Sequence, residues 1–370
     1  MSKKITKIVL TGGPAGGKTT LISRILHEFK QEEGWRVFTI PETATELISG
    51  FGIRPFGNCM SMLAFQDFVI ADQIHKEKLA LDAAQIVNED NILIIYDRAL
   101  MDDKAYISDE EFAEVLSHFD GRTEASVLAG YDAVLHLVSA ADGAEQYYTT
   151  ATNATRYEQA NEEGLRIARE LDKKVIKAWT GHPHLRVINN HDDFENKLNR
   201  VITEISKVVG LPQPVQEERI FRVELIGDIP ECSESLITQT YLVAEPGCEV
   251  RLRRREWSGG KVVNVHRSKK RISDTEIIET ERQIDNNLYE QMLQQADPYR
   301  ATIRKKRQSF IWKGQFFEID TFLEPLDNLV MMETKGVTEK ETVNFPPFVK
   351  VLEDVTGNTR YLNYNLALKR

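Results

Sequence analysis

The sequence has few cysteines and no long hydrophobic run. Its three cysteines, Cys59, Cys232 and Cys248, stand far apart and lack the spacing of a metal-binding pair. No stretch of eighteen apolar residues is present, so we expect no transmembrane segment, and the opening MSKKITKIVL does not resemble a signal peptide. These features predict a cytoplasmic protein with free thiols.

Basic residues do not outnumber acidic ones, which argues against general duplex DNA binding. The formal net charge is −10. Before Gln216, 23 Lys and Arg stand against 32 Asp and Glu, and from there on 24 stand against 25. The second part nevertheless groups its cations, which predicts a small anionic ligand and no specific nucleic acid. The groups are Arg251, Arg253, Arg254 and Arg255, then Arg267, Lys269, Lys270 and Arg271, then Arg304, Lys305, Lys306 and Arg307.

Two domains are expected from the length and from a change of pattern. In residues 1–210, apolar strand-like runs alternate with helical patterns, such as 18–30, 60–87 and 154–171, which predicts an α/β domain with a parallel sheet. Residues 211–216 hold two prolines and are interpreted as a linker. Residues 217–370 contain eight short alternating segments, which predict an antiparallel eight-stranded β-barrel.

The most specific motif lies between the first strand and the first helix. Residues 12–19 are GGPAGGKT and fit the P-loop pattern G-x-x-x-x-G-K-[ST]. Glycines let such a loop wrap phosphates with backbone N–H groups, and the helix N-terminus adds partial positive charge. We expect Lys18 to contact the β- and γ-phosphates of ATP or GTP and the Thr19 hydroxyl to bind Mg²⁺. The predicted nucleotide-binding residues are Gly12, Gly13, Pro14, Ala15, Gly16, Gly17, Lys18, Thr19 and Thr20.

A second apolar strand ends in a carboxylate. Residues 92–97, ILIIYD, place Asp97 where a Mg²⁺-binding strand of a P-loop protein needs it. Arg98 follows directly, an arrangement that resembles nucleoside and nucleotide kinases. Glu42, after the second strand, stands where such kinases place a carboxylate near the acceptor or the attacking water, although a solvated strand-end acid is an equal alternative. The catalytic roles are therefore assigned to Lys18, Asp97, Glu42 and Arg98.

The nucleobase is not specified. Arg156, in NATRYEQANEE, lies in a stretch that resembles the lid of nucleotide kinases, although a surface pairing with Glu158 or Glu163 is the favoured interpretation. Residues 180–183 and 187–190 lie where this fold class often holds the base. No N-K-x-D segment for guanine is present, so ATP and GTP both remain open.

Charged residues alternate along the strands of residues 217–370. Arg251 and Arg253 share strand parity, and so do Lys305 and Arg307. Charges at this spacing cannot all lie in a dry core, so they either cover a solvated face or line a polar lumen. The predicted polyphosphate-binding residues are Arg251, Arg253, Arg267, Lys269, Lys305 and Arg307.

The order of these motifs resembles the CYTH-like triphosphate tunnel fold over residues 219–335. The matching motifs are R-x-R, E-x-E-x-x-I, I-x-K-x-R, F-E-I-D-x-F and M-E. The resemblance implies a barrel whose cations hold a triphosphate and whose acids hold a divalent metal, Mg²⁺ or Mn²⁺. With the P-loop ligands included, the expected metal ligands are Thr19, Asp97, Glu279, Glu281, Glu318, Asp320 and Glu333.

Two acidic motifs of that fold are incomplete here. The opening E-x-E-x-K motif is absent from residues 217–222, EERIFR, and Lys335 replaces the second acid of the last E-x-E. Because Mg²⁺ and Mn²⁺ require oxygen ligands, this departure favours an anion-binding barrel over an active triphosphatase.

The order of the two domains resembles that of the TRPL translocation defect proteins. The resemblance implies an AAA-type or kinase-like P-loop domain joined to a CYTH-like domain, with ATP or GTP bound. We therefore predict slow NTP hydrolysis, coupled to a barrel that binds a second phosphate-rich molecule or a phosphoinositide headgroup. The alternatives are a small-molecule or nucleoside kinase, a metal-dependent tunnel triphosphatase, and a non-catalytic switch or adaptor at membranes.

Overall fold

The chain folds into two compact units, Met1–Val201 and Ile202–Arg370. The computed structural model describes residues 3–30, 34–148, 161–190, 193–214, 219–230, 232–257, 260, 262–273, 276–313, 315–323, 326–327, 329–334 and 342–369. The boundary falls within helix α7 (Phe194–Val209).

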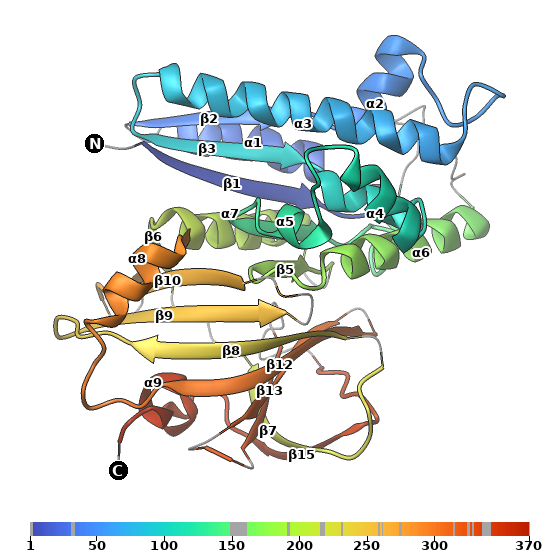
Figure 1. Cartoon of the computed structure of the whole chain (residues 1–370). Coiled ribbons are helices and arrows are strands. Elements are labelled where there is room, and N and C mark those ends of the chain that lie inside the picture. The colour runs from blue at the N-terminus through green and yellow to red at the C-terminus, as the bar shows by residue number, and fades with distance from the viewer. Residues whose placement is uncertain are drawn as a thin grey trace. The chain divides into compact units, whose positions relative to one another are not determined.

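The first unit is built on a parallel sheet of five strands (Figure 1). Its order is β2-β3-β1-β4-β5, and the strands are β1 (Lys4–Thr11), β2 (Trp35–Ile40), β3 (Asn91–Asp97), β4 (Ala133–Leu137) and β5 (Leu185–Ile188). Ile92 to Tyr96 are fully buried, as expected for a strand of a parallel sheet that is covered on both faces. The predicted α/β domain with a parallel sheet is confirmed.

Helices follow the strands in the alternation that the sequence predicts. They are α1 (Lys18–Lys30), α2 (Thr43–Glu46), the π-helix η1 (Leu47–Phe51), α3 (Met62–Ile86), the 3₁₀ turn η2 (Leu100–Ala105), α4 (Asp109–Ser117), α5 (Glu124–Leu128), the 3₁₀ turn η3 (Glu145–Tyr147), α6 (Glu162–Trp179) and α7. In the parts of the chain that the structure describes, no helix combines the length and apolarity needed to cross a membrane.

Helix α6 extends further than the sequence predicted. The expected helix ended at residue 171, whereas α6 continues to Trp179. Ala168, Asp172, Val175 and Trp179 are buried, and their spacing of three or four residues places them on one helix face. The charged run at 172–174 hid this periodicity. Residues 154–160, which include Arg156, lie outside the described residues.

The second unit contains one antiparallel sheet. The eight predicted segments are the strands β7 (Arg219–Leu225), β8 (Ser233–Tyr241), β9 (Cys248–Trp257), β10 (Val262–Arg271), β11 (Glu276–Ile284), β12 (Ile303–Trp312), β13 (Gln315–Phe322) and β14 (Val330–Thr334). Two further strands, β6 (Pro212–Pro214) and β15 (Val349–Asp354), extend the order to β15-β7-β14-β13-β12-β8-β9-β10-β11-β6. The segment interpreted as a linker, 211–216, thus contains β6, which pairs with β11.

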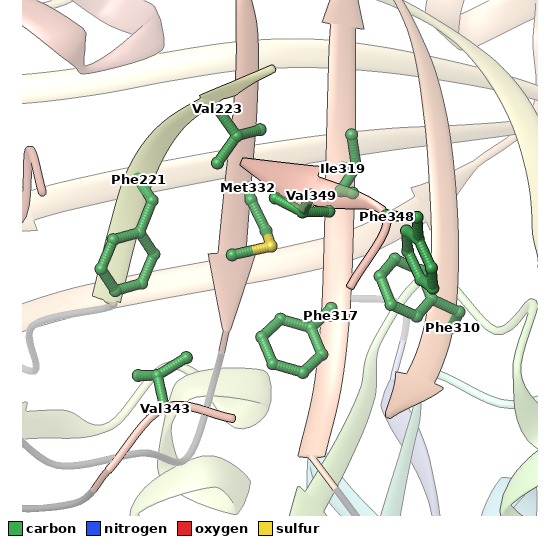
Figure 2. Packing of buried hydrophobic residues seen from close by; sticks show 9 residues of the cluster. All are labelled: Phe221, Val223, Phe310, Phe317, Ile319, Met332, Val343, Phe348 and Val349. Carbon is green, nitrogen blue, oxygen red and sulfur yellow. The ribbon is translucent and has the colours of Figure 1, made fainter. Parts of the chain in front are cut away.

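One face of this sheet carries an apolar core (Figure 2). Phe317 on β13 is fully buried, and its ring stacks on Phe310 of β12 with centroids 5.7 Å apart. Phe348, just before β15, meets Phe310 edge to face at 5.5 Å. The other cluster members are Phe221, Val223, Ile319, Met332, Val343 and Val349. Because side chains alternate along a strand, the residues between them point to the opposite face.

That opposite face of β12 and β13 is charged, and it is closed at one end by apolar residues. Lys305, Arg307, Glu318 and Asp320 lie on it and are all buried. At the end of the face, Tyr241, Ile303, Phe322 and Met331 pack with residues of the 3₁₀ turn η4 (Thr359–Tyr361) and the helix α9 (Asn363–Leu366). On β9, the face away from the charges packs Leu252 against Tyr289 of α8 (Asn286–Leu293).

Candidate nucleotide site and charged face

The loop after β1 requires glycine at two positions. Gly12 has φ +137°, and a Cβ there would lie 2.1 Å from the carbonyl oxygen of Leu137 at the end of β4. Gly17 has φ +90°, and a Cβ there would lie 2.6 Å from the ring of Phe194. Both positions combine a backbone conformation that disfavours side chains with a close neighbour. The two glycines therefore fix the path of the loop.

The carbonyl groups of the loop are held by donors. Lys18 Nζ donates to the Gly12 and Gly13 oxygens at 3.1 and 3.2 Å, and Ser139 Oγ donates to the Pro14 oxygen at 2.5 Å. The Ala140 N–H donates to the Ala15 oxygen at 3.4 Å, and Lys197 Nζ donates to the Gly16 oxygen at 3.1 Å. A peptide C=O and the following N–H point in opposite directions, so the contacts of Ser139, Ala140 and Lys197 direct the N–H groups of Ala15, Gly16 and Gly17 away from these donors, whereas the Gly13 N–H donates to Asp172. This is the orientation that a phosphate cradle needs.

Lys18 lies in a buried, mixed-charge environment. Its side chain is only 9% exposed. Burial lowers the pKa of Lys18 to about 8, the Arg98 cation acts in the same direction, and the acids Asp97, Glu42 and Asp102 oppose both. A bound phosphate would add negative charge and favour the ammonium form. Thr19 and Thr20, next along the chain, are exposed.

Asp97, Arg98 and Glu42 gather at the carboxyl ends of β3 and β2. Arg98 Nε donates to Glu42 Oε1 at 2.6 Å, and its Nη1 lies 3.2 Å from Asp102 Oδ1. Burial acts to raise the pKa of Glu42, but the Arg98 and Lys18 cations lower it on balance. Burial raises the pKa of Asp97, whose Oδ1 is buried and has no hydrogen-bond partner among the described residues. An unsatisfied carboxylate oxygen beside Lys18 fits a Mg²⁺ ligand.

Asp102 is a member of this cluster that the sequence reasoning missed. It is 2% exposed and accepts hydrogen bonds from Thr11 Oγ1, Arg98, the Ala99 N–H and Trp179 Nε1. It therefore ties β1, η2 and α6 together beneath the loop. No strand precedes Asp102 directly, so its place in the fold had no signal in the strand pattern.

Two more missed residues hold the loop from α6 and α7. Asp172 accepts hydrogen bonds from the Gly13 N–H and from His136 Nε2, the latter at 3.1 Å. Burial acts to raise the pKa of Asp172, but His136 and the Gly13 N–H lower it on balance. Lys197 is 3% exposed, and burial lowers its pKa to about 7. The helical periodicity of 168–179, extended past residue 171, is the signal that locates Asp172.

The segments expected near the base serve the fold in this structure. Thr180 Oγ1 donates to the Ile176 oxygen at 2.8 Å, which closes the end of α6. Asn190 Nδ2 donates to the Ser139 and Asp142 oxygens at 2.8 and 2.7 Å. Asn190 thus braces the chain that follows β4.

In the second unit, Arg307 is the centre of a buried ion-pair cluster. Its Nε and Nη2 contact Asp320 at 2.7 and 2.6 Å, and its Nη1 contacts Glu318 at 2.7 Å. Glu333 lies 3.8 Å from Nη2, and Lys305 Nζ donates to Asp320 at 2.5 Å. Burial lowers the pKa of Lys305 to about 8, against the attraction of Asp320. These cations are already neutralised within the protein.

A neighbouring group of arginines on β9 is less satisfied. Arg253 Nε and Arg255 Nη2 are buried and have no hydrogen-bond partner in the part of the chain that the structure describes. Burial, followed by the Arg251 cation, lowers the pKa of Arg253 to about 10. Burial also lowers the pKa of Arg255 to about 10, although Glu318 opposes it. Arg255, missed at the sequence level, shares the strand parity of Arg251 and Arg253.

The acids Glu279 and Glu281 on β11 are also paired with an arginine, which lies on the adjacent strand β10. Arg267 lies 2.6 Å from Glu279 and 3.9 Å from Glu281. Lys269 is half-buried and opposite Glu279 in the register. Among the described residues, no group of three or more His, Cys, Asp or Glu side chains is placed to hold a metal ion. The role of the acids expected to bind Mg²⁺ or Mn²⁺ here stays a prediction, and Glu217, Glu218 and Lys335 lie outside the described residues.

The comparison with known families agrees with the loop geometry. An AAA-domain family model matches residues 7–197, more than half of the chain. The chain belongs to the AAA-domain family. Its first unit is an AAA-like nucleotide-binding domain, and the matched range contains the phosphate loop, Asp97, Asp172 and Lys197.

Two solved structures resemble part of the chain. Both are of a protein designated NE1496, described in one case as a hypothetical protein and in the other as an inorganic triphosphatase. Each structure is 29% identical in sequence to this chain, with a TM-score of 0.33, and each match covers 42% of this chain. The match covers 99% of the chain in the first structure and 97% in the second. No curated protein matches the chain.

Proposed function

We propose that the AAA domain binds ATP or GTP with Mg²⁺ and hydrolyses it slowly. The main support is the conformation of the loop. Each backbone carbonyl from Gly12 to Gly16 accepts a hydrogen bond, and Lys18 lies buried beside them. Thr19 and Asp97 are the proposed Mg²⁺ ligands. When bound, Mg²⁺ would neutralise phosphate charge and orient the chain of phosphates.

The residues around Lys18 have distinct proposed tasks. Lys18 exchanges its contacts with the Gly12 and Gly13 carbonyls for phosphate oxygens. The amides of Ala15, Gly16 and Gly17 bind the same phosphates and are already oriented, so little ordering is needed on binding. Glu42 accepts a proton from the attacking water or acceptor hydroxyl, and Arg98 holds Glu42 in place.

We also propose that the charged face of the second unit binds a second phosphate-rich anion. Arg251, Arg253 and Arg255 share one face of β9, and buried guanidinium nitrogens without partners are costly in free energy. Phosphate oxygens would satisfy them by charge-assisted hydrogen bonds. Because Arg267 engages the acids Glu279 and Glu281, the arrangement supports binding of the anion over its metal-dependent cleavage.

A thermal-shift experiment separates the two proposed sites. Wild type, Lys18→Ala and Arg253→Met are incubated with ATP, GTP or tripolyphosphate, with and without Mg²⁺. A ligand that binds only the folded protein raises the midpoint of unfolding. We expect Lys18→Ala to lose the nucleotide shift alone, and Arg253→Met to lose the tripolyphosphate shift alone. Wild-type nucleotide affinity in Lys18→Ala would overturn the first proposal. Inositol hexakisphosphate and vesicles containing phosphoinositides then distinguish a free polyphosphate from a lipid headgroup.

A second candidate, a small-molecule kinase, is favoured by polar side chains grouped at the end of β3 around a small pocket with room for about one water molecule. Glu42, Thr43, Gln73, Arg98 and Asp103 line it. A carboxylate, an amide and a guanidinium together suit an acceptor that offers hydroxyl groups. ATP and Mg²⁺ with a panel of nucleosides and sugars provide the test, because only a kinase forms ADP in an acceptor-dependent manner.

A further proposal is a relationship to a family of two-domain proteins. The observed order, a P-loop unit followed by an antiparallel sheet unit, supports a relationship to the TRPL translocation defect proteins. A cytoplasmic location and a role as a switch or adaptor at membranes stay proposals, and the vesicle arm of the experiment above addresses the second.

A further inference from the structure

A buried lysine contacts the back of the phosphate loop and has no task in the reaction proposed above. Lys197, in the first turn of α7, places Nζ at 3.1 Å from the Gly16 oxygen, 2.8 Å from the Val138 oxygen and 2.6 Å from Asn190 Oδ1. All three acceptors are neutral. Burying an ammonium group with neutral partners is costly, which calls for a specific reason at this position.

The charges around Lys197 come from three other elements and from its own helix. Asp172 on α6 favours the charged form, whereas Arg200 on α7 and Lys18 on α1 oppose it. His136 on β4 is hydrogen-bonded to Asp172. None of these four charged or titratable residues is hydrogen-bonded to Nζ. The positive charge next to the Gly16 carbonyl therefore comes from Lys197 itself.

The bond to Gly16 determines where the next amide points. The peptide that joins Gly16 to Gly17 is planar, so its C=O and N–H point in opposite directions. With the oxygen drawn to Lys197, the Gly17 N–H is directed away from α7. One turn earlier, the ring of Phe194 packs so close to Gly17 that a Cβ there would lie 2.6 Å from it. Helix α7 therefore braces the loop at two successive residues.

We propose that Lys197 is a positioning residue of the nucleotide site. It fixes the Gly16 carbonyl so that the Gly17 N–H faces the phosphates, and it supplies a positive charge behind the loop. This inference rests on the proposed binding of nucleoside triphosphate. Glycine alone allows many orientations of this peptide, and Lys197 selects one of them.

The test measures affinity for MgATP and for AMP in wild type, Lys197→Met, Lys197→Arg and the matched control Lys174→Met, which removes an exposed lysine of α6. A hydrogen bond from a charged group corresponds to about 10- to 100-fold in affinity. We expect Lys197→Met to lose about that much for MgATP and much less for AMP, whose phosphate makes fewer loop contacts. Lys197→Arg restores most of the loss, and Lys174→Met behaves as wild type.

The pH profile supplies a readout that a purely structural role would not move. As the pH rises through about 7, wild type loses the charge on Lys197, so its MgATP affinity falls. The MgATP affinity of Lys197→Met does not show this decrease. If Lys197→Met does not fold, Lys197→Gln, which keeps a donor without the charge, replaces it. If the neutral variant keeps the MgATP affinity and the pH profile of wild type while Lys18→Ala loses binding, the role of Lys197 is overturned and the proposed nucleotide site is not. Absence of nucleotide binding in wild type would overturn both.

Discussion

Arg98 Nε lies 2.6 Å from Glu42 Oε1, and this ion pair joins the carboxyl ends of the neighbouring parallel strands β3 and β2. The pair borders a small pocket that Gln73 and Asp103 also line. Because ligands of parallel α/β sheets bind at the carboxyl ends of the strands, this edge is where a phosphate acceptor would meet the P-loop. Arg98 itself has φ +66°, a strained conformation for a residue with a side chain.

Replacing Glu42 by Gln tests its proposed role as a proton acceptor. Glutamine keeps the size of the side chain but cannot take a proton, so we expect the rate of phosphate release or transfer to fall at least about 100-fold. MgATP affinity, measured separately, stays close to wild type. Glu46→Gln, four residues on and paired with Lys76, is the control. A Glu42→Gln variant with full turnover would show that Glu42 is only a strand-end acid.

Gly12 and Gly34 offer a matched pair of glycines with positive φ. Gly12→Ala brings a Cβ to 2.1 Å from the Leu137 oxygen, whereas a Cβ on Gly34 meets nothing within 4 Å. Gly34→Ala is therefore destabilised only by the backbone strain of an alanine at positive φ, about 1 kcal/mol. Gly12→Ala lowers the free energy of unfolding by more than this and also abolishes the nucleotide-induced thermal shift. Equal stabilities by denaturant unfolding would contradict the close packing of the loop on β4.

Arg307 and Lys306 are adjacent cations with opposite environments. Arg307→Met leaves Asp320 and Glu318 buried without their main partner, so we expect a loss of about 3–5 kcal/mol in the free energy of unfolding. Lys306 is exposed and pairs with Glu234 at the surface, so Lys306→Met costs at most about 1 kcal/mol. Urea unfolding of both variants provides the measurement. Similar losses would mean that the Arg307 cluster is solvated.

The same cluster predicts how stability changes in acid. Burial acts to raise the pKa of Asp320, but Arg307 and Lys305 lower it well below the unfolded value of about 3.9. A depressed folded-state pKa contributes stability that is complete above about pH 4 and is lost as the pH falls from there toward the folded value. Asp320→Asn should be less stable at pH 7 and show a shallower loss below pH 4. Asp82→Asn, on the exposed side of α3, is the control.

The sequence by itself determined much of the P-loop unit and the strand content of the second unit. A contiguous motif between a strand and a helix predicts its own geometry, because Gly12, Gly17 and Lys18 act through local backbone conformation. The strands β7 to β14 were equally visible as period-two alternation, which depends only on neighbouring residues. The roles of Glu42, Arg98 and Arg253 in chemistry stay predictions.

Tertiary structure decided which distant residues complete each site. Asp102, Asp172 and Lys197 lie 90 or more positions away from Thr11, Gly13 and Gly16, which they contact, and no local pattern reveals these contacts. The pairing of Arg307 with Glu318 and Asp320, which leaves the arginines of β9 less satisfied, likewise depends on the register between strands. Local sequence fixes backbone conformation, whereas burial and charge pairing arise only when the chain packs, because they depend on neighbours that the sequence order does not reveal.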